Sequence, residues 1–171
     1  MTSGKERYIL AALYKYYDEC ILKNERKENN KIDNMVYIPY TNLKEPNLPG
    51  RIHMTKFEVI AYETENGDNP VEKFLDKLNP KMRAKIFGML VILQEKGNQL
   101  REPYSKHVED GIFELRCKFG SDITRVMYFF FDRGKIILIN GFVKKTQKTP
   151  VAEIQLAKAR RADYMERMKK L

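Results

Sequence analysis

The sequence has few of the residues from which metal and nucleotide sites are built. Its 171 residues include two histidines and two cysteines, Cys20 and Cys117, and none of them form a cluster with the spacing of a zinc site. It also lacks the GxxxxGK[ST] and GxGxxG stretches that cradle the phosphates of bound nucleotides. We therefore expect a protein that works without a metal ion or another cofactor.

Long hydrophobic runs are also absent. Runs such as MLVIL and VMYFFF are far shorter than the roughly 20 apolar residues of a membrane-spanning helix. The N-terminal stretch MTSGKERYIL has neither the apolar centre nor the small-residue cleavage site of a signal peptide. Two separate cysteines agree with reduced thiols. These features predict a cytoplasmic protein with no membrane segment.

Positive charge, by contrast, is in clear excess. The chain has 32 lysines and arginines against 23 aspartates and glutamates, a net charge of +9, and a pI near 9.4. Such a balance favours a polyanionic partner, for example nucleic acid, an acidic protein or a membrane surface. Charge alone does not distinguish among these partners.

The first 53 residues differ in pattern from the rest. Apolar residues at helical spacing predict a helix over residues 5–27. The tract that follows, residues 28–53, is rich in charged and amide residues and contains three prolines, which disfavour regular structure. We expect residues 1–53 to be an N-terminal helix and linker, and residues 54–171 to form the main domain.

The main domain begins with a predicted strand over residues 54–62 and continues with two helices. Asn69 and Asn79 each precede a proline, which is typical of a helix cap followed by the first helical residue. Apolar residues then recur on one side of each segment, and the second helix is expected to stop at Gly97.

Three further strands are predicted over residues 111–119, 123–131 and 135–144. Their connections are so short that consecutive strands must be antiparallel. Thr149 is expected to cap a final helix that has Pro150 at its first position, and the helical spacing places Tyr164 on the inner side of that helix. The predicted order β-α-α-β-β-β-α indicates an α+β domain.

Cationic side chains gather at one end of these three strands. Alternation places Glu114, Arg116 and Lys118 on one face of the first strand, and Arg125 interrupts an apolar second strand. Lys144 and Lys145 emerge at the same end of the third strand. We expect the five cations to lie on one patch.

Two interpretations fit this patch. The charges are solvated and include a pair such as Glu114 with Arg125 that protects a sheet edge, or they form a groove that binds phosphate. Cleavage of RNA without a metal needs a base, an acid and cations that face the phosphate. A lysine can serve as base where neighbouring cations lower its pKa. His107 is a rival base, although a single loop histidine is more often structural.

Three motifs, taken together, carry a resemblance. The stretches GIFELR, TRVMYFF and INGFVKKTQKTPVAEIQLAKAR resemble, in order and spacing, the HigB-like, phage-derived branch of the RelE/ParE toxin superfamily. The resemblance covers about residues 54–171. It implies a small, twisted, mostly antiparallel sheet with two N-terminal helices and a C-terminal helix. It also implies a metal-independent endoribonuclease that cuts mRNA in the ribosomal A site and is held inactive by an antitoxin.

The resemblance also implies roles for individual residues. The catalytic positions are Arg116, Arg125, Lys144 and Lys145, and the RNA-binding candidates are Lys106, Lys118, Lys148 and Tyr164. Tyr164 is a loose match to a tyrosine that stacks on a base. The expected partners are mRNA on the ribosome and a helix-turn-helix antitoxin with an acidic segment. Two alternatives are a ParE-like toxin that poisons DNA gyrase without cleaving RNA, and an inactive regulator that binds an antitoxin.

Overall fold

The computed structural model describes residues 57–132 and 134–170. In chain order its elements are β1 (Glu58–Ala61), α2 (Pro70–Asp76), α3 (Pro80–Lys96), a 3-10 helix (Gly97–Gln99), β2 (Ser105–Glu109), β3 (Ile112–Phe119), β4 (Asp122–Phe131), β5 (Lys135–Val143) and α4 (Val151–Lys169). The predicted helix over residues 5–27, the linker and the domain boundary at Met54 lie outside the described residues.

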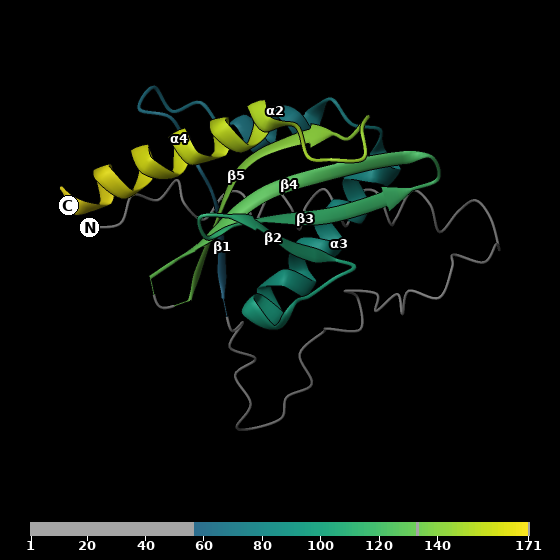
Figure 1. Ribbon diagram of the computed structural model, residues 1–171, viewed down its shortest axis with the longest axis horizontal. Helices are drawn as coiled ribbons and strands as arrows, with labels where there is room; N and C mark the ends of the chain where they lie inside the picture. Colours follow the sequence, from purple (N-terminus) through teal and green to yellow (C-terminus); the bar gives the residue numbers. More distant parts are fainter. Residues whose placement is uncertain (1–56, 133, 171) are drawn as a thin grey trace, which may run out of the picture.

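The strands form one mixed sheet with the order β1-β5-β4-β3-β2 (Figure 1). The pairs β2–β3, β3–β4 and β4–β5 are antiparallel, and β1 is parallel to β5. Because α2 and α3 connect β1 to the remaining strands, β1 can join the far side of the sheet in the parallel direction. The predicted α+β class and the antiparallel arrangement of the last three strands are confirmed.

The sheet has one strand more than the sequence predicted. β2 pairs with β3 at one edge of the sheet, and its register shifts between His107 and Glu109. The segment SKHVE has only one large apolar residue, Val108, so it lacks the alternation that identifies a half-buried strand. As an edge strand it has a neighbour on one side only, which lets polar residues dominate its sequence.

Two of the three predicted helix starts are confirmed. The side chain of Asn69 accepts the Glu72 N–H at 3.0 Å, and that of Asn79 accepts the Met82 N–H at 2.8 Å. α4 begins differently, because Pro150 occupies the cap position and no side chain caps the helix. The predicted Thr149 cap is therefore wrong. Its hydroxyl instead donates a hydrogen bond to the carboxylate of Glu114.

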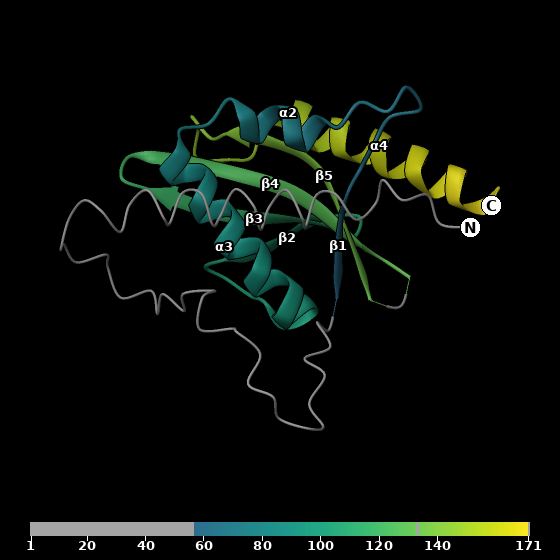
Figure 2. The same cartoon turned by 180° about the vertical axis from the view of Figure 1, so that it is seen from behind.

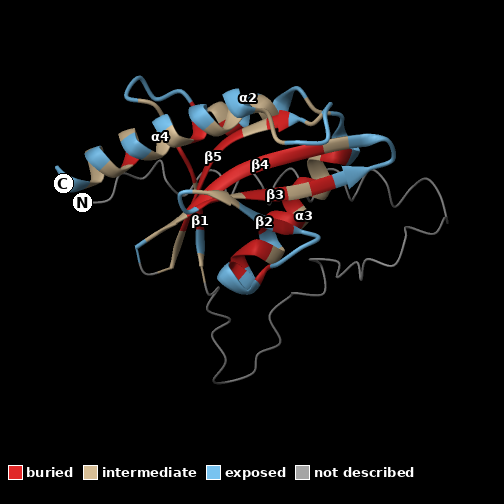
Figure 3. Cartoon of the chain, in the orientation of Figure 1, coloured by how far each residue is buried: buried red, intermediate tan, exposed pale blue. Residues whose placement is uncertain are grey.

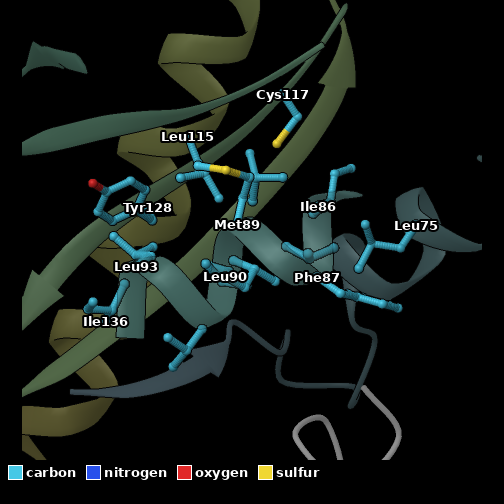
Figure 4. Close-up of a cluster of buried hydrophobic side chains, with 14 of the residues drawn as sticks. Leu75, Ile86, Phe87, Met89, Leu90, Leu93, Leu115, Cys117, Tyr128 and Ile136 are labelled. Atoms are coloured by element: carbon cyan, nitrogen blue, oxygen red, sulfur yellow. The ribbon is translucent and has the colours of Figure 1, made fainter. Parts of the chain in front are cut away.

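The sheet is covered by helices on both faces, and each face has its own core. α2 and α3 pack on one face and α4 on the other (Figures 1 and 2). Among the residues that the structure describes, those of the central strands are the most buried (Figure 3). Figure 4 shows the larger core, in which α3 residues such as Met89 and Leu93 pack against Leu115 and Tyr128 of the sheet.

Cys117 belongs to this larger core. Its side chain is buried beneath α3, and burial raises the pKa of its thiol to about 12 (Figure 4). A protonated, enclosed thiol is a poor nucleophile, so we assign Cys117 a packing role. Among the described helices, none is both long and apolar enough to span a bilayer.

Candidate phosphate-binding site

The helix α4 covers only part of its face of the sheet. The β3–β4 hairpin extends beyond the N-terminal end of α4 (Figure 1). On β4, Met127 belongs to the core beneath α4, so alternation places Arg125 on the same face. Arg125 is directly opposite Arg116 in the antiparallel register, and Glu114 is two residues before Arg116 on β3. Three charged residues thus share the part of the face that lies beyond α4, where Arg116 is partly exposed and Glu114 and Arg125 are buried.

Glu114 lies between the two arginines. Its Oε1 atom is 3.2 Å from Arg116 Nε and 3.4 Å from Arg125 Nε, and its other oxygen, Oε2, accepts a hydrogen bond of 2.7 Å from the Thr149 hydroxyl. The Glu114 side chain is only 3% exposed. Like charges directly opposite one another on adjacent strands repel, so the buried carboxylate stabilises the arginine pair.

The two arginines differ in how far they reach solvent. Arg116 has 26% of its side chain exposed, and its Nη1 atom lies 2.9 Å from Glu102 Oε2. Arg125 is 8% exposed, and its Nη1 donates to the Thr124 carbonyl at 2.8 Å. Burial lowers the pKa of Arg125, while the charge of Glu114 acts in the opposite direction. Arg116 is therefore the guanidinium that is more open to a ligand.

Lys144 joins the arginines from the end of β5. Its backbone N–H donates to the Ile123 carbonyl at 2.8 Å, which extends the β4–β5 pairing toward the hairpin. The pKa of Lys144 lies below its ordinary value, chiefly because the side chain is partly buried. Three positive charges lower it further, and Glu114 opposes them; the three are Arg125, Arg116 and Lys106. We call Lys106, Arg116, Arg125 and Lys144 the cationic cluster.

Three other predicted site residues lie around the cluster and face solvent. Lys118 is two residues beyond Arg116 on β3, and its register partner is Ile123. Lys145 and Lys148 belong to the loop between β5 and α4, and all three lysines are exposed. The structure thus brings Lys106, Arg116, Arg125 and Lys144 together, with Lys118, Lys145 and Lys148 at the surface of the same hairpin and loop.

The structure corrects the base-stacking assignment of Tyr164. Tyr164 is only 9% exposed, and its ring packs edge-to-face against Phe129 and Phe131, with centroid distances of 5.8 and 5.2 Å. The ring lies in the core between α4 and the sheet. This placement argues against contact with an RNA base and agrees with the inward position that the helical spacing predicts.

His107 is not part of the cationic cluster. It belongs to β2 and not to a loop, and its ring packs edge-to-face on Phe113 at 5.1 Å. Its Nε2 atom accepts the Gly111 N–H at 3.3 Å. Alternation along β2 directs His107 away from the face that Lys106 shares with Glu114. A structural role accounts for these contacts.

The interpretation of Glu114 and Arg125 as a sheet-edge pair is half correct. The pair forms, but β3 lies between β2 and β4, and β4 lies between β3 and β5. Neither residue is at an edge, so the pair does not protect one. Sequence reasoning also missed Glu102 and Thr149. The sequence around Glu102 carries no signal for its contact, and a threonine before a proline, as at Thr149, is typical of a helix cap.

The comparison with protein families agrees with these motifs. The model of the family described as "Phage derived protein Gp49-like (DUF891)" matches residues 73–162, more than half of the chain. This chain belongs to the Gp49-like family. The family is toxin-like and of the RelE/ParE type. The match includes every residue of the cationic cluster, together with Glu102, Glu114 and Thr149. No curated protein matches the chain.

Proposed function

We propose that this Gp49-like protein is the toxin of a type II toxin–antitoxin module and cleaves mRNA on the ribosome, as HigB-like toxins do. The observation that carries the proposal is the cationic cluster on the part of the sheet beyond α4, with Arg116 and Arg125 aligned by the buried Glu114. Aligned guanidinium groups suit the planar, bidentate recognition of phosphate oxygens.

The charge of the site suits a phosphodiester. The four cations of the cluster face two carboxylates, Glu102 and Glu114, so two positive charges are left uncompensated. RNA brings one negative charge per phosphate, and the pentacoordinate transition state carries more. Preorganised cations stabilise that added charge without having to reorganise during the reaction.

Lys144 is the proposed base. Neutral Lys144 takes the proton of the ribose 2′-hydroxyl, the 2′-oxygen attacks phosphorus, and the bond from phosphorus to the 5′-oxygen breaks. The leaving 5′-oxygen takes a proton from Lys106, and the products are a 2′,3′-cyclic phosphate and a 5′-hydroxyl. The lowered pKa of Lys144 increases its neutral fraction near neutral pH, which a general base requires.

The pH dependence of cleavage tests this role of Lys144. Below the pKa of a base, its neutral fraction rises about tenfold per pH unit, so the cleavage rate should rise with pH through the neutral and mildly alkaline range. Because the pKa of Lys144 is lowered, the rise should level off below the ordinary pKa of lysine. The rate of Lys144→Met should be low and lose this rise. A rate that does not change with pH across this range would contradict the role of Lys144 as base.

Three readouts separate the proposed function from its alternatives. Induction of the full chain in bacteria should stop translation and fragment mRNA, with cuts that depend on the ribosome. Gyrase poisoning would give a DNA-damage response with intact mRNA, and an inactive regulator would give neither effect. Arg116→Ala serves as the control, because it should abolish the mRNA fragments while the protein remains folded.

We further propose an antitoxin partner with an acidic segment that covers the cationic cluster. Complementary charge speeds association and is screened by salt. The dissociation constant of the complex should therefore increase as the salt concentration rises from about 50 mM to about 500 mM. Calorimetric titration at several salt concentrations measures this dependence. A constant affinity across the range would indicate an apolar interface and contradict the proposal.

A further inference from the structure

The loop between β5 and α4 is attached to the sheet at both of its ends. At its start, the Lys144 N–H donates to the Ile123 carbonyl at 2.8 Å. At its end, the Thr149 hydroxyl donates to Glu114 Oε2 at 2.7 Å. Lys145 and Lys148 lie between these two attachments. The attachments therefore determine where the lysines of the loop lie relative to the arginines.

The Thr149 hydroxyl bonds to Glu114 and not to the backbone of the helix that follows it. A threonine that precedes a proline at the start of a helix often takes the cap position, and such a cap contributes about 1 kcal/mol to stability. Here Pro150 takes the cap position and Thr149 lies one residue before it, so α4 begins without a side-chain cap, and the Thr149 hydroxyl donates to a carboxylate 35 residues away in the chain. Local rules of this kind are most often broken at functional sites.

We propose that Thr149 is a positioning residue that acts through Glu114 on the phosphate-binding arginines. Its hydrogen bond to Oε2 fixes the rotation of the buried carboxylate, so that Oε1 faces the Nε atoms of both Arg116 and Arg125. The same bond joins the lysine-bearing loop to the arginine pair. The effect of Thr149 on cleavage rests on the proposed function, whereas its effect on the arginines does not.

The loss of the hydroxyl has a defined physical consequence. Without it, Oε2 of a carboxylate that is 3% exposed lacks its side-chain donor. A buried acceptor without a partner is costly, and the carboxylate can lower that cost by rotating toward other donors. Rotation would move Oε1 from its place between the two guanidinium groups.

The first test observes the arginines directly. In proton–nitrogen NMR spectra of the full chain, the Nε–H signals of Arg116 and Arg125 should shift or broaden in Thr149→Val, which keeps the shape of threonine but has no hydroxyl. Thr149→Ser and the control Thr146→Val should resemble the wild type, because the Thr146 hydroxyl donates to the Lys148 carbonyl and not to Glu114. Thr149→Ala replaces the valine variant if valine disturbs the backbone signals.

The second test measures cleavage by the same variants on ribosomes. We expect kcat to fall about 10- to 100-fold in Thr149→Val, because a misplaced catalytic group loses that order of rate, while KM changes little. Thr149→Ser should restore kcat, and Thr146→Val should not alter it.

The outcomes separate the two proposals. Unchanged arginine signals in Thr149→Val would overturn the positioning role. The same would follow if Thr149→Ser changed the arginine signals or kcat as much as Thr149→Val does. Altered signals with an unchanged kcat would show that the placement of the arginines does not matter for cleavage. That outcome would also overturn the positioning role of Thr149. If the wild type cleaves no RNA, the proposed function fails, and the arginine signals alone decide whether Thr149 positions the pair.

Discussion

Arg116→Ala is expected to lower the rate of mRNA cleavage by about 100- to 1000-fold while the domain stays folded. The guanidinium of Arg116 is the more exposed one of the pair, and it is aligned from two sides by Glu102 and Glu114. Loss of one preorganised donor that faces the charge of a transition state typically costs about 2.7 to 4 kcal/mol, which corresponds to that loss of rate. Single-turnover cleavage on programmed ribosomes measures the change.

Two further variants make this result specific. Arg83→Ala removes the same charge from α3, on the other face of the sheet, where Arg83 pairs with the exposed Asp76. It should cleave at nearly the wild-type rate. Arg116→Lys keeps the charge but loses the planar fork, so its rate should lie between those of the wild type and the alanine variant. Full activity in a folded Arg116→Ala would overturn the assignment of the site.

The helices were predictable because their signals are local. Asn69 and Asn79 cap their helices within three residues, and the proline that follows each of them has a backbone dihedral suited to the first helical turn. β3, β4 and β5 were also predictable, since short connections leave only an antiparallel arrangement. β2 was not, because an exposed edge strand needs little of the apolar alternation that marks a strand.

The site was predictable only as far as it depends on strand register. Arg116 and Arg125 face each other because the connection between their strands is short. The contacts of Glu102 and Thr149 join residues that are 14 and 35 positions apart, and no local pattern encodes such contacts. Tyr164 shows the opposite case: its helical spacing correctly placed it inward, whereas the resemblance suggested an exposed role.

Arg125 is expected to behave differently from Arg116, because it supports both the fold and the site. Its side chain is 8% exposed and is paired with the buried Glu114. Removing one partner of a buried ion pair typically costs about 3 to 5 kcal/mol, and the contacts of Glu114 with Arg116 and Thr149 keep the cost toward the lower end of that range. Arg125→Met should therefore lower the free energy of unfolding by about that amount, as measured by chemical denaturation, and also abolish cleavage.

A second substitution separates these two roles of Arg125. When both partners of a buried ion pair are replaced by apolar residues, the change in stability is often neutral or favourable. The double variant Arg125→Met with Glu114→Leu should thus regain most of the lost stability, since Arg116 keeps its contact with Glu102. It should still not cleave mRNA, because the phosphate has lost one guanidinium and the carboxylate that aligned the other. Recovered cleavage in this variant would show that Arg125 contributes only to folding.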